Sequence, residues 1–236
     1  MTTRTGILAA MEEELEILLH ALELEEATEQ AGVRFYTGNL DGTPVVLGEC
    51  GIGKVNAALA TTLMLHIFSP SVVLNTGTAG GLRDEYDVGD IVLGEIVSYH
   101  DVDATAFGYV YGQVPREPAT FAADPTLLSS ALQAGKDVAG VSVRTGLIAS
   151  GDVFLGDVQA RELVRSRFPN VGAVEMEAAA IAQVCHHFNI PCLIVRAVSD
   201  LAGNDARMTH EEFLHIAADN SARLVMATLK KYYDPS

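Results

Sequence analysis

The chain has few cysteines and no long apolar run, and both absences exclude classes of protein. Its three cysteines, Cys50, Cys185 and Cys192, are odd in number and lack the C-x-x-C spacing, so we expect no disulfide framework. No apolar stretch reaches the roughly 18 residues that a membrane span needs. The first residues, MTTRTGILAAMEEEL, run straight into acids without a cleavage signal, which predicts a cytoplasmic protein.

Basic residues are scarce as well. Lysine and arginine number 15 against 31 aspartates and glutamates, and the formal net charge is -16. A surface of this sign repels the phosphates of nucleic acids and of anionic lipids, so we expect no nucleic acid and no membrane as partner. Hydrophobic residues make up 49% of the chain, which is enough for a sizeable buried core.

Short apolar runs alternate with amphipathic ones along the whole chain. We expect helices to begin near Glu12, Lys54, Pro125, Gly156, Met176 and His210. Strands are expected at 5–11, 33–40, 43–51, 71–77, 90–100, 141–150, 171–176 and 192–200. This alternation indicates an α/β protein whose parallel or mixed sheet is covered on both faces. No linker or internal repeat interrupts it, so residues 1–236 are predicted to form a single domain.

Two glycine-rich stretches and one Cys/His segment are candidates for ligand binding. GECGIGK (48–54) matches a phosphate-binding loop, but Val55 replaces the hydroxyl residue that holds Mg²⁺, which excludes the usual NTPase. NTGTAGG (75–81) either presents backbone N–H groups or simply turns. In CHHFNIPC (185–192), Asn189 and Pro191 indicate a helix end followed by a new strand, so no metal site is expected.

Acids gather where apolar runs end, and ligands of α/β sheets bind at the carboxyl ends of strands. In MEEEL (11–15) two of three acids suit a helix N-terminus, and the third is free to face the crevice. Ser199 and Asp200 follow the apolar run of a strand. They are either helix caps or a proton donor, and the sequence leaves both interpretations open. Since G-x-S-x-G and H-E-x-x-H are absent, the chemistry rests on carboxylates.

Taken together, ILAAMEEEL, SGDVFL, VEMEAAAIAQVCHHFN and VRAVSD resemble the bacterial 5′-methylthioadenosine/S-adenosylhomocysteine nucleosidase family. GIGKVNAALA, NTGTAGGL and HDVDATAFGYVYGQ fit the same family, and the resemblance spans nearly the whole chain. It implies the nucleoside phosphorylase-like fold, a three-layer α/β/α arrangement with a central mixed sheet, and a homodimer without metal or organic cofactor. The implied reaction is hydrolysis of the N-glycosidic bond to adenine and a 5-thioribose product, a step of methionine salvage.

The resemblance also implies roles for individual residues. Asp200 would protonate adenine N7 with Ser199 orienting it, and Glu14 would activate the water. Glu177 would hold the ribose hydroxyls, whereas Glu175 either contacts substrate or supports the helix N-terminus that follows. Phe107 would reach across a dimer to the neighbouring pocket. The full set of implied substrate-binding residues is Ala10, Met11, Ile52, Thr78, Ala79, Gly80, Phe107, Phe154, Leu155, Glu175, Met176, Glu177, Arg196, His210 and Phe213.

Three departures and three rival functions remain at this point. Thr78, Ala104 and His210 stand where relatives often carry Ser, Val and Phe, and the last two put the shape of the 5′-substituent pocket in doubt. One rival is a purine nucleoside phosphorylase on the same fold, for which Arg83 and Arg196 are the candidate phosphate ligands. Another is a nucleosidase that prefers 5′-deoxyadenosine or an aminofutalosine. The third is a non-catalytic nucleoside-binding module, which the joint presence of Glu14, Ser199 and Asp200 argues against.

Overall fold

The computed structural model describes residues 4–138, 140–201 and 206–234, except for the side chains of 206–211. The helices are α1 (Glu12–Ala21), α2 (Lys54–Phe68), the 3-10 helix η1 (Thr105–Phe107), α3 (Pro125–Gly135), α4 (Val158–Arg167), α5 (Ala178–Phe188) and α6 (Ala206–Tyr233). The strands are β1 (Thr5–Ala9), β2 (Glu23–Gln30), β3 (Val33–Leu40), β4 (Thr43–Glu49), β5 (Val72–Asn75), β6 (Thr78–Gly81), β7 (Ile91–Tyr99), β8 (Phe121–Ala122), β9 (Val143–Ser150), β10 (Val171–Glu175) and β11 (Cys192–Leu201).

The described strands form one mixed sheet in the order β2-β3-β4-β1-β5-β11-β6-β10-β9-β7-β8. The long strand β11 pairs in parallel with β5 and then with β6, and its middle also pairs antiparallel with β7. Because β7 continues through β9 and β10 back to β6, five strands close into a ring. The predicted mixed sheet is therefore confirmed, with the addition that half of it curls into a barrel.

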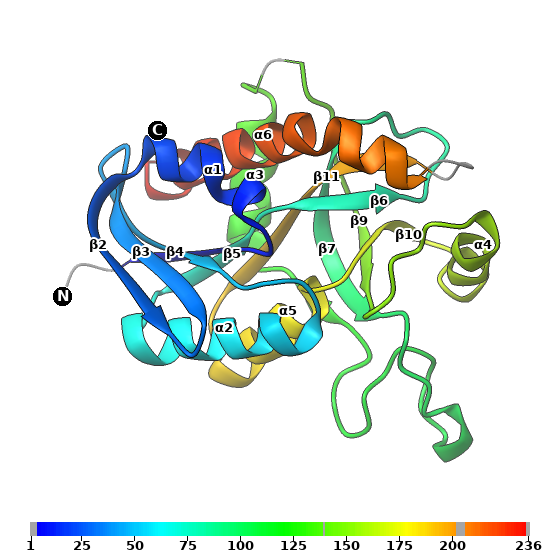
Figure 1. The fold of residues 1–236 in the computed structure, drawn as a ribbon. Helices are drawn as coiled ribbons and strands as arrows, with labels where there is room; N and C mark the ends of the chain where they lie inside the picture. Colours follow the sequence, from blue (N-terminus) through cyan, green and yellow to red (C-terminus); the bar gives the residue numbers. More distant parts are fainter. Residues whose placement is uncertain (1–3, 139, 202–205, 235–236) are drawn as a thin grey trace.

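Helices cover both faces of this sheet, as the sequence predicts (Figure 1). Helices α1, α3 and α6 lie on one face, where Leu15, Leu18 and Leu224 belong to one buried apolar cluster. Helices α2 and α5 lie on the other face, and Met64 and Ile181 belong to a second cluster there. Strand β11 is buried along nearly its whole length because it lies between these two layers.

The segment boundaries follow from local chemistry. Helix α3 begins after Asp124, whose carboxylate accepts hydrogen bonds from Thr126 N and Leu127 N, with Pro125 as its first residue. Helix α5 ends at Asn189, which adopts the left-handed conformation of a helix C-cap. The expected helix end and the strand starting at Cys192 are thus confirmed. Helix α6 begins at Ala206, four residues before the expected His210.

The long segment between β7 and α3 contains only the short elements η1 and β8. In Figure 1 it extends away from the sheet at the lower right. No helix within the described residues is long and apolar enough to cross a membrane.

Candidate active site

A cavity of about 130 Å³ opens where β1, β6, β10 and β11 end. Thirteen of the residues implied by the resemblance line it, which brings together segments from the whole length of the chain. Val174, which was not expected, completes the lining. The expected residues at this cavity are Ala10, Met11, Glu14, Ile52, Thr78, Ala79, Gly80, Phe154, Glu175, Met176, Glu177, Ser199 and Asp200.

Glu14 is the one acid of the MEEEL stretch that turns inward, since Glu12 and Glu13 are exposed and Glu14 is buried. One carboxylate oxygen accepts hydrogen bonds from Ala10 N at 3.0 Å and from Met11 N at 3.3 Å. The other accepts from both the N–H and the hydroxyl of Thr78, at 2.8 and 3.1 Å. These bonds fix the carboxylate at the cavity wall, as a base that must align a water requires.

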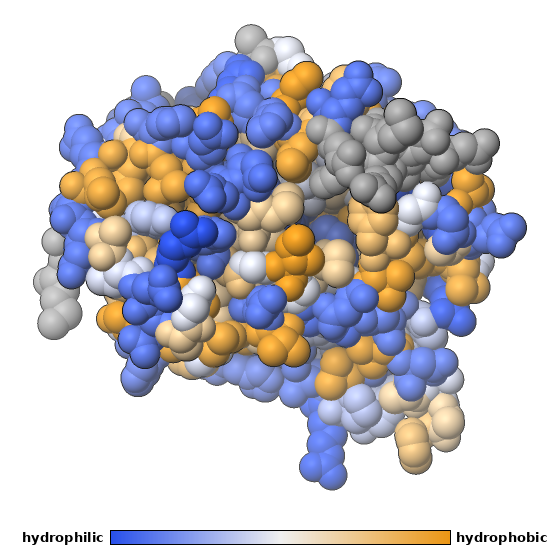
Figure 2. All heavy atoms as spheres, viewed as in Figure 1, coloured by the Kyte–Doolittle hydropathy of each residue, from blue (hydrophilic) through white to orange (hydrophobic). Residues whose placement is uncertain are grey.

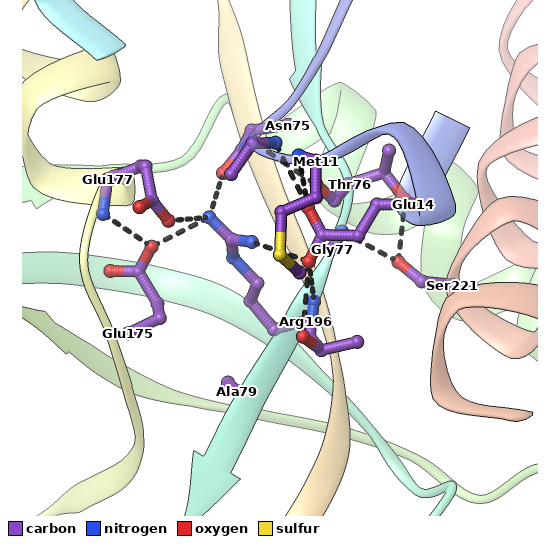
Figure 3. A network of polar contacts seen from close by, with 12 residues as sticks. Met11, Glu14, Asn75, Thr76, Gly77, Ala79, Glu175, Glu177, Arg196 and Ser221 are labelled. Atoms are coloured by element: carbon purple, nitrogen blue, oxygen red, sulfur yellow. Dashed lines mark hydrogen bonds and ion pairs between the residues drawn. The ribbon is translucent and has the colours of Figure 1, made fainter. Parts of the chain in front are cut away.

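A single buried arginine connects the remaining glutamates (Figure 3). Nη2 of Arg196 lies 2.7 Å from a carboxylate oxygen of Glu175 and 3.3 Å from one of Glu177, and it also donates to Asn75 Oδ1. Nη1 lies 4.0 Å from Glu14. Three buried carboxylates thus share one guanidinium, so the site carries excess negative charge.

Glu175 and Glu177 make different contacts in the site. Glu175 is at the end of β10, and its carboxylate accepts hydrogen bonds from Glu177 N at 2.9 Å and Ala178 N at 2.8 Å. It therefore caps α5, and Ser150 adds a hydroxyl bond to Glu175 and accepts from Ala179 N at 2.8 Å. This geometry favours the supporting role for Glu175 over direct contact with substrate.

The Glu177 carboxylate faces the cavity and accepts a hydrogen bond from Gly53 N at 2.8 Å. Burial, followed by the neighbouring charge of Glu175, raises the pKa of Glu177 to about 7, against the pull of Arg196. The glycine-rich stretch 48–54 therefore presents its backbone N–H to a carboxylate of the site and not to a phosphate. Lys54 is held by Asp101 at 2.7 Å.

Asp200 and Ser199 lie near the end of β11 and line the same cavity as Glu14. The Ser199 hydroxyl donates to Asp200 Oδ1 at 3.1 Å, and Arg161 forms an ion pair with Asp200 Oδ2. Both residues are buried and line the cavity, which favours the functional interpretation of this pair over helix capping.

Five of the expected residues are not among those that line this cavity; one is Arg196, described above, and the other four follow. Leu155 lines a separate cavity of about 40 Å³ that adjoins the first one at Phe154. Phe107 is 83% exposed on η1 and does not line the cavity of its own chain. Phe213 is half-buried on α6 without reaching the lining, and the side chain of His210 lies outside the described residues.

Sequence reasoning missed three residues that hold the site in place: Arg161, Asn75 and Ser150. Asn75 and Ser150 end strands, which is the signal that could have found them. Nothing in QARELVRSR distinguishes Arg161 from an ordinary surface arginine of an amphipathic helix.

The arrangement suits the cleavage of a neutral substrate that becomes cationic. Glu14 and Asp200 line one small cavity, and Glu14 is held there by four hydrogen bonds. Carboxylates around the space between them repel an anionic nucleophile. Of the two arginines considered for phosphate, Arg196 is engaged by carboxylates and Arg83 donates to Val171 O at 3.1 Å.

A larger hollow of about 550 Å³ lies between β8, α5 and β11 but lacks this chemistry. Asp124, which caps α3, is the only acid among the described residues that line it. Among the described residues no group of three or more His, Cys, Asp or Glu side chains is arranged to hold a metal ion.

Comparisons with known proteins agree with this geometry. A family model described as the Phosphorylase superfamily matches residues 4–230. The chain is 51% identical, over 93% of its length and 95% of the relative's, to a 5′-methylthioadenosine/S-adenosylhomocysteine nucleosidase from Anoxybacillus flavithermus.

Two solved structures give the same result at the level of the fold. The Neisseria meningitidis 5′-methylthioadenosine/S-adenosylhomocysteine nucleosidase in complex with methylthio-immucillin-A matches with a TM-score of 0.94 and 45% identity, covering 98% of this chain and 100% of the other. A futalosine hydrolase of Helicobacter pylori matches with a TM-score of 0.92 and 31% identity, covering 98% of both chains. The chain therefore belongs to the phosphorylase superfamily and, within it, to the 5′-methylthioadenosine/S-adenosylhomocysteine nucleosidases.

Proposed function

We propose that this protein hydrolyses the N-glycosidic bond of 5′-methylthioadenosine and S-adenosylhomocysteine, releasing adenine and the 5-thioribose product. The observation that carries the proposal is the placement of Glu14, Glu177 and Asp200 around one cavity. Relatives about half identical over nearly the full length carry this activity in their names, which supports it further. We also propose that the enzyme acts in methionine salvage and that it is cytoplasmic.

Glu14 acts as the base. Cleavage of the C1′–N9 bond gives the sugar oxocarbenium character, and the water that attacks C1′ must lose a proton. Glu14 takes this proton while its other contacts, to Ala10 N, Met11 N and Thr78, keep it aligned. Its negative charge also stabilises the cationic transition state.

Asp200 acts as the acid. The adenine leaving group takes both electrons of the C1′–N9 bond and needs a proton at N7, which the Asp200 carboxyl supplies while Ser199 orients it. The two proton transfers balance. Water adds OH to C1′ and leaves one proton on Glu14, while Asp200 gives one proton to adenine.

Glu177 grips the ribose hydroxyls, and Met176, Ile52 and Phe154 supply apolar surface for the thio substituent and the base. A hydroxyl bonded to a charged carboxylate contributes about 1.5–3 kcal/mol. Such a bond also pushes electron density toward the ring, which suits a cationic transition state.

The test is adenine release from 5′-methylthioadenosine with and without phosphate. Equal rates and a free sugar product are expected, whereas strict phosphate dependence with a sugar 1-phosphate would replace this proposal by a phosphorylase. Asp200→Asn and Glu14→Gln should each lower kcat at least about 100-fold. Glu13→Gln, an exposed acid next to Glu14, is the control and should keep the wild-type rate.

A second candidate substrate deserves a direct comparison because a futalosine hydrolase shares the fold over 98% of both chains. We propose that methylthioadenosine and adenosylhomocysteine are preferred, since the more similar relatives carry those names. Measuring kcat/KM for these two nucleosides, 5′-deoxyadenosine and an aminofutalosine decides the ranking. A higher value for either of the last two would change the assignment.

We also propose a homodimer in which Phe107 closes the pocket of the neighbouring subunit. Exposed apolar side chains support it: Val55 on α2 is 78% exposed and Phe107 is 83% exposed. Figure 2 shows apolar surface at the lower edge of the molecule, over α2 and around the tip of the loop that carries η1. Exposed apolar patches of this kind mark interfaces between chains.

A further inference from the structure

Arg161 is the most deeply buried charge that the proposed mechanism does not use. It lies on α4, and only 2% of the residue is exposed, although arginine is almost never fully buried without a partner. Its guanidinium donates from Nε to Leu155 O at 2.6 Å and from Nη2 to Asp200 Oδ2. Nη1 is buried and has no hydrogen-bond partner among the described residues.

The two acceptors that Arg161 occupies belong to the purine end of the proposed site. Asp200 is the proposed proton donor to adenine N7, and the resemblance implies that Leu155, next to Phe154, contacts the base through its backbone. Adenine protonated at N7 carries two parallel donors on one edge, the N6 amino group and N7–H. The Nε and Nη2 edge of a guanidinium likewise presents two parallel donors. The arginine therefore offers the same hydrogen-bond pattern as the bound base.

The small volume of the site agrees with this comparison between Arg161 and adenine. The cavity of about 130 Å³ and the adjoining one of about 40 Å³ together fall far below the about 300–1,000 Å³ of typical ligand pockets. The smaller one is bounded by Arg161, Leu155 and Asp200. A Cβ on Gly80 would lie 3.2 Å from Arg161 Nη2 and 3.4 Å from Asp200 Oδ2, so the backbone of β6 also closes on this pair.

The contact with Asp200 points the same way. Arg161 occupies Oδ2 of the carboxyl group that, by the proposed mechanism, donates to adenine N7. Helix α4, which carries Arg161, lies at the edge of the molecule in Figure 1.

We propose that Arg161 fills the adenine subsite of the free enzyme as an internal substitute for the purine edge and leaves it when the base binds. The inference rests on the proposed function, because that function assigns Asp200 to adenine N7. A binding-competent state that is only partly populated lowers the apparent affinity by its population. Arg161 thus sets the affinity for the base and holds Asp200 in place while the site is empty.

The test is the dissociation constant of adenine, measured by calorimetry at neutral pH. Arg161→Met removes the competing donors and should tighten adenine binding by about tenfold or more. Arg165→Met, one turn further along α4 and paired with Glu162 outside the site, is the matched control and should bind like the wild type. Equal or weaker binding by the Arg161→Met enzyme overturns the proposal.

Two further measurements keep the proposal testable if Arg161→Met does not fold. Arg161→Lys retains the charge but lacks the planar pair of parallel donors that a guanidinium presents, and it should tighten binding by a smaller factor. In a crystal structure of the wild type with adenine, Arg161 should no longer donate to Leu155 O. If Arg161 keeps both hydrogen bonds while adenine is bound, the proposal that adenine displaces Arg161 is rejected.

The outcomes also separate this inference from the proposed function. A wild-type enzyme that releases adenine from methylthioadenosine, with a variant that binds adenine no tighter, rejects only the role of Arg161. A wild type that neither releases nor binds adenine rejects the function itself.

Discussion

At the scale of single residues, the site depends on how closely groups approach Arg196 and Glu14. One guanidinium and three carboxylates occupy a buried region, where unpaired charge is costly. The chain meets this condition with backbone donors: Gly53 N bonds Glu177, and Thr78 N bonds Glu14. Close approach of the backbone to these groups restricts which residues can stand between Arg196 and Glu14.

Gly77 shows the consequence. A Cβ at this position would lie 2.0 Å from Arg196 Nη1 and 2.8 Å from Glu14 Oε1, so Gly77→Ala must displace both groups. Because a displacement of about 1 Å in a catalytic group lowers rates about 100-fold, we expect kcat/KM to fall by about that factor. Gly146→Ala in β9 is the control, since its nearest neighbour lies at 3.7 Å. Comparable kinetics for the two variants would contradict the close packing around Glu14.

Glu177 predicts a pH dependence of stability. Its pKa in the folded protein is about 7, above the ordinary value of 4.5, mainly because of burial. The folded state therefore holds the proton longer than the unfolded chain, and this contribution to stability is lost as the pH rises from about 4.5 to about 7. The total is on the order of 3 kcal/mol.

Glu177→Gln removes this titration, so its free energy of unfolding relative to the wild type should increase between pH 5 and pH 8. Urea denaturation at both pH values measures it. Glu13→Gln controls for the loss of one acid. If the free energies of unfolding of the Glu177→Gln protein and the wild type differ by the same amount at both pH values, Glu177 is not the titrating group.

At the scale of elements, α5 begins inside the site, and its first turn is satisfied by side chains from β9 and β10. Glu175 accepts from two N–H groups of this turn and Ser150 accepts from Ala179 N. The same carboxylate pairs with Arg196, so the helix and the site share one support.

Ser150→Ala should therefore destabilise the protein by about 1–2 kcal/mol, the usual effect of losing a helix cap with a buried partner. The loss is measured by urea denaturation of the purified variant. Ser166→Ala removes an exposed hydroxyl that bonds Leu163 O on α4, and it should change stability by much less. Equal losses in the two variants would argue against the capping role of Ser150.

The sequence predicts some of these elements well and others not at all. All eight expected strands form, since each carries an apolar run that the core must bury. Strand β2 was not expected because its residues, ELEEATEQ, are all exposed and bear no buried face, so only pairing with β3 makes it a strand. Strand β6 is four residues of TAGG, which no pattern distinguishes from a turn.

The residues of the site likewise divide into those that the sequence predicts and those that it does not. Glu14, Glu177, Ser199 and Asp200 follow apolar runs and belong to distinctive motifs, so the sequence identifies them. Arg161 reaches Asp200 from a helix 39 residues earlier in the chain, and only the closure of β6, β10 and β11 brings the two together. Contacts that depend on curvature of the sheet leave no trace in local periodicity.

At the scale of the whole molecule, the exposed apolar face argues for a dimer. Val55, Leu59 and Phe107 are exposed, and the hollow between α2 and α5 is lined mainly by apolar side chains. Val55→Asp places a charge in the middle of this face, so we expect a monomer in analytical ultracentrifugation. Because Phe107 is proposed to close the neighbouring pocket, the monomer should also show a KM raised at least about tenfold, the effect of one lost aromatic contact of about 1.5 kcal/mol.

Two controls separate assembly from pocket closure. Ile216→Asp changes an exposed residue of α6, on the opposite side of the sheet from α2, and should leave a dimer with wild-type KM. Phe107→Ala removes the aromatic ring without adding charge, and it should keep the dimer while raising KM. If the Val55→Asp protein sediments as a monomer but keeps the wild-type KM, each subunit has a complete pocket and Phe107 serves assembly alone.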